Sequence, residues 1–407
     1  MKAVIEPSAL SGEIEAIASK SQAHRLLICA ALADKTTVVR CATVSADIEA
    51  TAACMRALGA RIERTDGAFT VEPIRELPAS AVIDCGESGS TLRFLLPVVC
   101  ALGVETTIVM HGRLPERPLS PLWEELEAHG AKLSRPAKDA IAVSGRIGGG
   151  TYTLAADVSS QFISGLLFAL PLTGACGRIE LTGTVESAGY IDMTVRALRV
   201  FGVTASADPH GYTLSPSAKY VSPGSVTVEG DWSNAAFWIC ADRILGGTLS
   251  ITGLDPDSPQ GDRAAADVSL RIAAGSAVVD CRDIPDLVPV LAVLASVSPG
   301  QTRFVNAGRL RIKESDRLKT TAALLSSLGA RVEQLDDGLI VTGVRRLRGG
   351  EADSANDHRI AMSAAVAALA CESPVILHGA QAVNKSYPAF WQDYARLGGR
   401  VTLEEEP

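Results

Sequence analysis

The amino-acid sequence predicts an α/β protein of two similar domains, each made of three α/β repeats. Three observations support this fold class: the length of the chain, a phrase that recurs along it, and the even spacing of the recurrences. The chain has 407 residues, and single hydrophobic cores stop growing beyond about 250–300 residues. More than one core is therefore expected.

Each recurrence is an amphipathic run that ends at a glycine, followed by two runs of alternating residues joined by a turn. Helical spacing that ends at glycine predicts a helix with a left-handed cap. Alternation on both sides of a turn such as Asp-Gly predicts a β-hairpin. The clear copies are CMRALGARIERTDGAFTVEP (54–73), LEAHGAKLSRPAKDAIAVSG (126–145), LRVFGVTASADPHGYTLSP (198–216), LLSSLGARVEQLDDGLIVTG (324–343) and YARLGGRVTLEEE (394–406).

The spacing of the capping glycines predicts six repeats. The glycines are Gly59, Gly130, Gly202, Gly329 and Gly398, with steps of 71, 72, 127 and 69 residues. Because 127 is nearly two periods, we interpret ADVSLRIAAGSAVVDCRDIPD (266–286) as a sixth, shortened repeat whose helix reaches Gly275 and whose hairpin is deleted. Chance phrases in an unrelated α/β chain are the alternative, but spacing and hairpins agree with each other.

Six repeats divide into three plus three, with a boundary near the Pro-, Gly- and Ser-rich stretch KYVSPGSVTVEGDWS (219–233). We expect one domain at residues 19–228 and a second formed by residues 1–18 with 229–407. A cleft between two such domains is the default place for a ligand.

Composition excludes several classes of protein. Hydrophobic residues make up 47% of the chain and charged residues 21%, which is typical of a soluble globular protein. The net charge of −8 disfavours a nucleic-acid binder. We expect no signal peptide and no membrane span. The nine cysteines form no CxxC pair and lie mostly in apolar runs, so we expect buried, reduced thiols in a cytoplasmic protein without a metal site.

Several predicted helices begin with small polar residues beside cations. Starts are expected near Ser19 or Ser21, in the glycine loop GESGS (86–90), at Ser159 or Ser160, near Ser233, near Ser315 and near Asp357. Each start alone is most simply an ordinary N-cap, yet free N–H groups at a helix start also bind anions. The cations in or beside these starts and loops are Lys20, Arg25, Arg117, Lys313, Arg317, Arg359 and Lys385. Together they indicate a site for a polyanionic small molecule.

Two acids lie among these cations. Glu314 directly follows Lys313 in RLRIKESDRLKT (309–320), and Asp286 ends RDIPD (282–286). Such carboxylates are either partners in salt bridges or general acids and bases in proton transfer. The residues alone leave both interpretations open.

Eight motifs together are similar to the 5-enolpyruvylshikimate-3-phosphate (EPSP) synthase family of enolpyruvyl transferases. They are SKSQAHR (19–25), GESGSTLR (86–93), ERPLSPL (116–122), SSQF (159–162), IPD (284–286), KESDRL (313–318), DHR (357–359) and NKSYPAFW (384–391). The resemblance covers essentially the whole chain, and KESDRL with SSQF and DHR is its most specific part.

The resemblance implies a fold, a reaction and a set of partners. The fold is an inside-out α/β barrel in each domain, with three βαβαββ units about a pseudo-threefold axis. The reaction transfers the carboxyvinyl group of phosphoenolpyruvate to the 5-hydroxyl of shikimate 3-phosphate, by addition and then elimination. The family works without a metal or organic cofactor, as a monomer whose domains close over the two small-molecule substrates. No nucleic-acid or membrane partner is expected.

The resemblance also implies roles for particular residues. Asp286 takes the proton of the 5-hydroxyl, Glu314 handles the proton at the methylene carbon, and Lys20 assists the departing phosphate. Shikimate 3-phosphate is expected to contact Lys20, Ser21, Arg25, Ser159, Ser160, Gln161, Ser187, Asp286 and Lys313. Phosphoenolpyruvate is expected to contact Lys20, Gly89, Arg117, Gln161, Arg317, Arg359 and Lys385.

Three positions depart from the family pattern. Glu87 and Ser90 stand where many members have Asn and Thr, and Glu87 adds a carboxylate near the expected phosphoenolpyruvate site. Affinity for phosphoenolpyruvate and for glyphosate, the inhibitor of the family, is therefore open. Arg309 stands where many members have Asn, and no role is assigned to it.

Three alternatives belong to other functions. The related transferase that acts on UDP-N-acetylglucosamine usually carries a reactive cysteine in a mobile loop, and the corresponding loop HGRLPERPLSPL (111–122) has none. A non-catalytic repeat clamp for nucleic acid would need a basic face and would not need Glu314 beside Lys313. A catalytically inactive relative would lack a motif acid or base, and none is missing.

Overall fold

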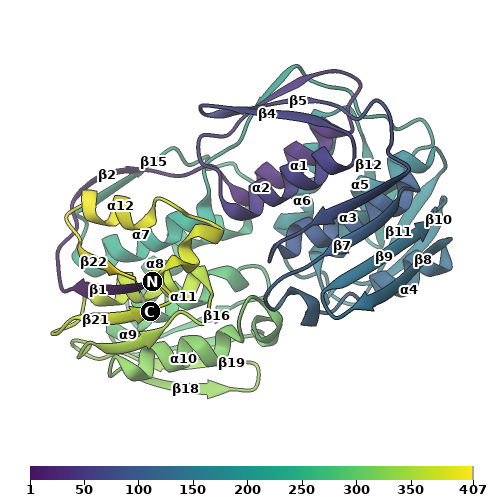
Figure 1. Cartoon of the computed structure of the whole chain (residues 1–407). Coiled ribbons are helices and arrows are strands. Elements are labelled where there is room, and N and C mark those ends of the chain that lie inside the picture. The colour runs from purple at the N-terminus through teal and green to yellow at the C-terminus, as the bar shows by residue number, and fades with distance from the viewer. Residues whose placement is uncertain (406–407) are drawn as a thin grey trace. The chain divides into compact units, whose positions relative to one another are not determined.

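The computed structural model describes residues 1–405 and shows mixed α/β architecture in two compact parts (Figure 1). The contiguous lobe is Ala18–Glu229, and the split lobe is Met1–Ile17 together with the chain from Gly230 onward. The predicted boundaries, 19–228 and 1–18 with 229–407, lie one residue from these. That each lobe is a domain able to fold alone stays a prediction.

The contiguous lobe contains three four-stranded sheets with one strand order. The sheets are β14-β3-β5-β4, β6-β7-β9-β8 and β10-β11-β13-β12, and in each the first pair is parallel and the last pair is an antiparallel hairpin. The strands are β3 Thr37–Arg40, β4 Arg61–Thr65, β5 Ala68–Glu72, β6 Ser80–Asp84, β7 Glu105–Val109, β8 Ala131–Ala137, β9 Ala140–Gly145, β10 Gly150–Ala155, β11 Gly177–Thr182, β12 Ala205–Asp208, β13 Gly211–Leu214 and β14 Ser225–Thr227.

The split lobe contains two sheets of the same kind and one smaller sheet. Their orders are β16-β17-β19-β18, β20-β21-β1-β22 and β15-β2. Strand β1 pairs antiparallel with both β21 and β22, so segments from the two ends of the sequence share a sheet. The strands are β1 Lys2–Glu6, β2 Gly12–Glu15, β15 Leu249–Thr252, β16 Ala277–Asp280, β17 Gln301–Val305, β18 Arg331–Leu335, β19 Gly338–Thr342, β20 Gly350–Asp353, β21 Val375–His378 and β22 Arg400–Glu404.

Helices fill the centre of each lobe, and the sheets lie outside them. Helices α3, α9 and α11 are buried along nearly their whole length, as expected for helices that are apolar on every face. Helix α3 packs against α5, and α7, α9 and α11 contact one another. The helices are α1 Lys20–Ala31, α2 Ala46–Ala57, α3 Gly89–Leu102, α4 Leu122–Ala128, α5 Ser160–Ala169, α6 Ala188–Val200, α7 Trp232–Leu245, α8 Ala265–Ala273, α9 Val288–Val297, α10 Arg317–Ser327, α11 His358–Ala368 and α12 Phe390–Arg396.

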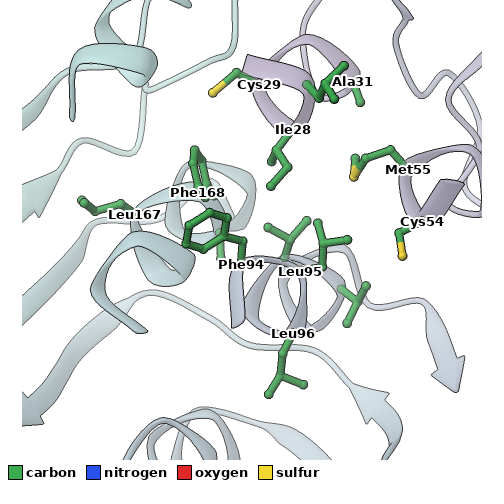
Figure 2. Close-up of a cluster of buried hydrophobic side chains, with 14 of the residues drawn as sticks. Ile28, Cys29, Ala31, Cys54, Met55, Phe94, Leu95, Leu96, Leu167 and Phe168 are labelled. Atoms are coloured by element: carbon green, nitrogen blue, oxygen red, sulfur yellow. The ribbon is translucent and has the colours of Figure 1, made fainter. Parts of the chain in front are cut away.

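Figure 2 shows the core of the contiguous lobe, where side chains of α1, α2, α3 and α5 meet. Phe94 of α3 and Phe168 of α5 make an edge-to-face contact with ring centroids 5.5 Å apart. Ile28 of α1 and Met55 of α2 are fully buried in the same cluster. This packing fixes the first turns of α1, α3 and α5, which carry most of the predicted site residues of this lobe.

The shortened repeat is present as predicted. Helix α8 is followed directly by β16, which pairs in parallel with β17 of the next sheet. The glycines that end the repeated helices all have positive φ, from 76° at Gly202 to 132° at Gly275, as the predicted left-handed caps require. The six-repeat interpretation is therefore confirmed.

The capping residues of two helices and the exposure of one cysteine were not predicted. Helices α7 and α10 begin within two residues of the predicted Ser233 and Ser315, but their caps are Asp231 and Asp316. An aspartate was available in each case, and its carboxylate is as good an N-cap as a hydroxyl. All nine cysteines are free, but Cys176 is exposed while the other eight are buried. Along residues 1–405, no helix is long and apolar enough to cross a membrane.

Candidate active site

The start of α1 places Lys20 and Ser21 at the edge of the contiguous lobe's core. Ser19 caps the helix by accepting from the backbone N–H of Gln22. The Lys20 ammonium lies 3.0 Å from a carboxylate oxygen of Asp47, in the first turn of α2. Asp47 was not predicted as a site residue, because nothing in its local sequence indicates a contact with α1.

Arg25 is a buried cation whose hydrogen-bond acceptors are all neutral. Its guanidinium donates to the Thr194 hydroxyl at 2.8 Å, to the Ser21 carbonyl at 2.6 Å and to the Tyr190 carbonyl at 2.8 Å. It also lies over the Phe94 ring, 4.9 Å from the centroid. Burial lowers the pKa of Arg25 to about 10, so the side chain stays charged at neutral pH. A buried, charged group without a carboxylate partner favours an anionic ligand.

Gln161 is held in one orientation by two neighbours. Arg93 donates to the Gln161 amide oxygen at 2.8 Å, and the amide nitrogen donates to the Ser90 hydroxyl at 3.0 Å. Arg93 also donates to the Pro118 carbonyl at 3.1 Å. The predicted Ser159 caps α5 and accepts from the Gln161 backbone N–H. Arg93 thus connects α3, α5 and the segment after Arg117.

The lack of a side chain at Gly89 lets Arg117 approach the start of α3. A Cβ atom at Gly89 would lie 2.6 Å from the nearest guanidinium nitrogen of Arg117. The predicted pair is therefore brought together. The Glu87 carboxylate lies against Gly112, where a Cβ atom would be 2.5 Å from it. Its effect on phosphoenolpyruvate stays a prediction.

Two further predicted serines lie at helix starts of the contiguous lobe. Ser160 is the first residue of α5 and is buried. Ser187 caps α6 and is also buried, with a φ of 57° in the left-handed region. A serine rarely adopts this conformation, so the surrounding structure must hold the backbone in it.

Arg317 is the centre of the split lobe's site and binds three carboxylates. Its side chain is 1% exposed. It donates to both oxygens of Asp357, at 2.7 and 3.2 Å, and to one oxygen each of Asp286 and Glu314, both at 2.7 Å. Burial alone would lower the pKa of Arg317, but Asp357, Glu314 and Asp286 raise it. The predicted acids and the predicted cation thus form one network.

Asp286 is surrounded by three cations. Besides Arg317, the Lys313 ammonium lies 3.4 Å from one carboxylate oxygen and the Arg359 guanidinium 3.2 Å from the other. Arg359 also donates to the Asp286 backbone carbonyl at 3.0 Å. Burial would raise the pKa of Asp286, but Arg359, Lys313 and Arg317 hold it well below its usual range. Asp286 is therefore ionised at neutral pH.

The Lys313 ammonium titrates close to neutral pH. Burial lowers the pKa of Lys313 to about 8; Asp286 opposes this shift, and Arg317 and Arg309 add to it. Arg309, which had no assigned role, thus acts on Lys313 through its charge.

Asp357 was missed as a site residue, although the DHR motif was recognised. Its carboxylate is fully buried, and it caps α11 by accepting from the backbone N–H of Arg359 at 3.0 Å. It also accepts from the Ser315 hydroxyl at 2.9 Å. The sequence signal was available, since an aspartate at a helix start is two residues from a predicted cation. Its pairing with Arg317, however, spans 40 residues.

A short 3-10 turn precedes or contains each of three predicted cations. Arg117 follows η1 (Leu114–Glu116), Lys313 follows η5 (Gly308–Ile312), and Lys385 ends η6 (Ala380–Lys385). Each turn comes after the second strand of its repeat, β7, β17 or β21. The repeat therefore delivers a cation at one structural position three times. The ammonium of Lys385 donates to the backbone carbonyl of Asn356, at 2.7 Å and next to Asp357.

Within residues 1–405, no group of three or more His, Cys, Asp or Glu side chains is arranged to hold a metal ion.

In the split lobe, hydrogen bonds and ion pairs connect Asp286, Lys313, Glu314, Arg317 and Arg359. In the contiguous lobe, contacts link Ser21 with Arg25 and Gly89 with Arg117. The residues connected in the split lobe combine acids with cations, whereas those connected in the contiguous lobe are cationic or neutral.

Comparison with known proteins gives a consistent match over the whole chain. Residues 4–394 match the family model described as EPSP synthase (3-phosphoshikimate 1-carboxyvinyltransferase). The 3-phosphoshikimate 1-carboxyvinyltransferase of Clostridium novyi (strain NT) is 39% identical, covering 98% of this chain and 97% of that protein. The protein of the same name from Clostridium perfringens (strain ATCC 13124) is 40% identical, covering 98% of both.

Solved structures show the same fold. The EPSP synthase from Acinetobacter baumannii has a TM-score of 0.82 at 23% identity, over 100% of both chains. The enolpyruvyl transferase NikO from Streptomyces tendae has a TM-score of 0.75 at 19% identity, over 100% of this chain and 99% of that one. At these identities the likeness concerns the fold, and it confirms the predicted fold class.

Proposed function

Because the chain belongs to the EPSP synthase (3-phosphoshikimate 1-carboxyvinyltransferase) family, we propose that it transfers the enolpyruvyl group of phosphoenolpyruvate to the 5-hydroxyl of shikimate 3-phosphate. Inorganic phosphate is the second product. The observation that carries the proposal is the pair of carboxylates, Asp286 and Glu314, held on the single guanidinium of Arg317. Addition followed by elimination needs one group for the hydroxyl proton and another for the methylene carbon.

The addition step forms the bond between the 5-hydroxyl oxygen and the second carbon of phosphoenolpyruvate. In the proposal, Asp286 accepts the hydroxyl proton while Glu314 donates a proton to the methylene carbon, which becomes a methyl group. In the elimination step, the Glu314 carboxylate takes a proton from that methyl group. The bond to the phosphate oxygen breaks, and Lys20 stabilises the leaving phosphate. Asp286 then passes the hydroxyl proton to the leaving phosphate, so that both carboxylates return to their starting states and the protons and electron pairs balance over the two steps.

Asp286 must become a better base than it is in the ligand-free chain. Three cations hold its pKa well below the usual range, and a base of low pKa accepts protons poorly. The carboxylate and phosphate of phosphoenolpyruvate are expected to bind two of the same cations, Arg317 and Arg359. Sharing Arg317 and Arg359 with the substrate weakens their hold on Asp286 and raises its pKa. Substrate binding would thereby activate the base.

Residues of both lobes are proposed to bind the anionic groups. Arg25 has neutral acceptors only, which supports a contact with the phosphate of shikimate 3-phosphate. The other residues proposed to bind this substrate are Lys20, Ser21, Ser159, Ser160, Gln161, Ser187, Asp286 and Lys313. Those proposed for phosphoenolpyruvate are Lys20, Gly89, Arg117, Gln161, Arg317, Arg359 and Lys385. That the substrates bind between the lobes, and that the lobes close on them, stays a prediction.

The protein is proposed to act as a cytoplasmic monomer on small-molecule substrates, without nucleic acid or membrane as partner. Gel filtration of the purified chain tests the monomeric state. An elution volume that corresponds to about twice the mass of 42.5 kDa would overturn it.

One assay tests the function against its nearest alternative. The purified chain is mixed with phosphoenolpyruvate and shikimate 3-phosphate, or with phosphoenolpyruvate and UDP-N-acetylglucosamine, and phosphate release is measured. We expect release with shikimate 3-phosphate alone. Release only with UDP-N-acetylglucosamine would assign the chain to the other transferase, and release with neither would favour an inactive relative or a binding scaffold.

A further inference from the structure

The segment between β17 and α10 carries Lys313 and Glu314 but has no regular hydrogen-bonded structure of its own beyond the turn η5. Such a segment is mobile unless other groups hold it. Arg311 lies two residues before Lys313, and no role in the reaction was assigned to it. Its contacts show what holds the segment in place.

The Arg311 guanidinium docks the segment onto the turn between β18 and β19. Its Nε donates to the Asp336 carbonyl at 3.1 Å, and one Nη donates to the carbonyls of Leu335 and Asp336, both at 3.0 Å. The same turn is bound a second time, because the backbone N–H of Ala307 donates to the Asp337 carbonyl at 3.2 Å. The hairpin turn is therefore the support on which the segment rests.

The other Nη of Arg311 closes the segment on itself. It lies 3.1 Å from a carboxylate oxygen of Asp316, whose other oxygen caps α10 by accepting from the Lys319 backbone N–H. Residues 311 and 316 are thus joined across the four residues between them, which include Lys313 and Glu314. One planar guanidinium connects the hairpin, the helix start and both ends of the reactive segment.

We propose that Arg311 is a positioning residue for the reaction: it holds Glu314 and Lys313 in register with Asp286 and Arg317 without touching substrate. This inference rests on the proposed function. A guanidinium suits the task because its donors point in fixed, separate directions, whereas a lysine ammonium offers one point of contact. Arg311→Lys keeps the charge and loses the simultaneous contacts with the two carbonyls and the carboxylate.

Loss of this support is expected to lower the turnover rate rather than to unfold the protein. A displacement of about 1 Å in a reacting group can cost about 10²-fold in rate. We therefore expect Arg311→Lys to lower kcat by about 10- to 100-fold. Asp316→Asn keeps an N-cap residue but removes the ion pair, and we expect a smaller loss of about threefold to tenfold.

A matched control lies in the contiguous lobe. Arg178 also contacts a hairpin through several bonds: its guanidinium donates to both oxygens of Asp208, at 2.8 and 3.3 Å, and to the Thr213 hydroxyl. It is remote in sequence from every proposed site residue except Ser187. We expect Arg178→Lys to leave kcat unchanged. If Arg178→Lys and Arg311→Lys lowered kcat equally, then contacts between an arginine and a hairpin would matter only for the stability of the fold. That result would overturn the proposal.

The deciding experiment is a double-mutant cycle with Glu314→Gln. If Arg311 acts through Glu314, its replacement costs little once Glu314 can no longer transfer a proton, so the two losses do not add. We expect Arg311→Lys to lower kcat by less than about threefold in the Glu314→Gln background. A loss as large as in the wild-type background would overturn the proposal. Circular dichroism and the melting temperature of each variant report whether the fold is retained.

The same experiment separates this inference from the proposed function. If the wild-type chain releases no phosphate with shikimate 3-phosphate, the proposed function has failed. If the wild type is active and Arg311→Lys retains its full kcat with an unchanged melting temperature, the function stands and the positioning role is wrong.

Discussion

Two buried arginines, one in each lobe, have opposite surroundings. Arg25 in the contiguous lobe donates to one hydroxyl and two carbonyls, all neutral. Arg317 in the split lobe donates to the carboxylates of Asp286, Glu314 and Asp357. A buried cation with neutral partners attracts an anion from outside, whereas one with three carboxylates is already compensated. The comparison supports the proposal that Arg25 binds an incoming anion, whereas Arg317 holds the two carboxylates proposed for proton transfer.

Equivalent turns in the two lobes can be compared residue by residue. After β6, the Asp84 carboxylate accepts from the backbone N–H of Gly86 at 2.8 Å; after β20, Asp353 accepts from Ala355 at 2.7 Å. Gly86 and Ala355, each the third residue of its turn, have similar left-handed φ values of 56° and 51°. The backbone of the repeat is therefore the same in both lobes at this point.

The residue that caps the next helix differs in charge between the two turns, and so does the residue before it, Glu87 against Asn356. Ser88 caps α3 and accepts from the Thr91 backbone N–H at 3.2 Å, whereas Asp357 caps α11 and also binds Arg317. A neutral cap leaves the positive end of the helix available to a ligand, while a carboxylate neutralises it. At the start of α11 the capping carboxylate thus also holds the Arg317 guanidinium, whereas the cap of α3 is a neutral hydroxyl.

The largest expected effect is on proton transfer in the split lobe. Glu314→Gln removes the group proposed to protonate and deprotonate the methylene carbon, and we expect kcat to fall by about 10²–10⁴-fold. Asp286→Asn is expected to act similarly at the hydroxyl. Steady-state phosphate release measures both. Glu404→Gln, at an exposed carboxylate of the same lobe, is the control. Turnover near the wild-type value in either site variant would remove that residue from the mechanism.

The next effect is on stability and compares the two arginines directly. Arg317→Met leaves the fully buried Asp357 without its guanidinium, and we expect it to lower the free energy of unfolding by about 3–5 kcal/mol. Arg25→Met leaves neutral groups, and the Tyr190 carbonyl keeps the Thr194 hydroxyl as a donor, so we expect a loss of about 1 kcal/mol. Urea titrations followed by circular dichroism measure both.

A second variant checks the cause of the larger loss. Adding Asp357→Asn to Arg317→Met removes the uncompensated charge, and part of the lost stability should return. Equal losses for Arg25→Met and Arg317→Met would break the comparison between the lobes.

A smaller effect is a dependence on pH that comes from Lys313. Because the pKa of Lys313 is about 8, its positive charge is present below that pH and is lost as the pH rises. We expect kcat/KM for shikimate 3-phosphate to fall by about tenfold per unit above this pKa. In Lys313→Arg the side chain stays charged, and the fall should move to higher pH. An unchanged profile in Lys313→Arg would show that another group titrates.

The smallest effect is expected at the tether of η1, the counterpart of η5 in the contiguous lobe. Lys138, 80% exposed, lies 3.2 Å from Glu116. Exposed ion pairs contribute little, so we expect Lys138→Ala to change kcat by less than about twofold. Steady-state kinetics measure it. A loss comparable to that of Arg311→Lys would show that both segments depend on their tethers equally.

Local patterns in the sequence predicted the repeats well but not the pairing inside the site. Gly59 and Gly329 could be placed because a helix end and a hairpin follow each other in sequence. Asp357 could be recognised as a helix start, but its contact with Arg317 depends on how α10 and α11 pack. Arg25 was expected at the site, yet its neutral partners on α6 are 165 and 169 residues away. Long-range packing, which no local pattern encodes, decided which charges are compensated.

Titration calorimetry with shikimate 3-phosphate tests most directly whether Arg25 binds this substrate while Glu314 serves proton transfer. The ligand is titrated into the wild type, Glu314→Gln and Arg25→Met. We expect Glu314→Gln to keep the dissociation constant within about threefold, and Arg25→Met to weaken binding by about 10- to 100-fold, since a charge-assisted hydrogen bond contributes about 1.5–3 kcal/mol. Equal weakening in both variants, or unchanged binding in Arg25→Met, would contradict it.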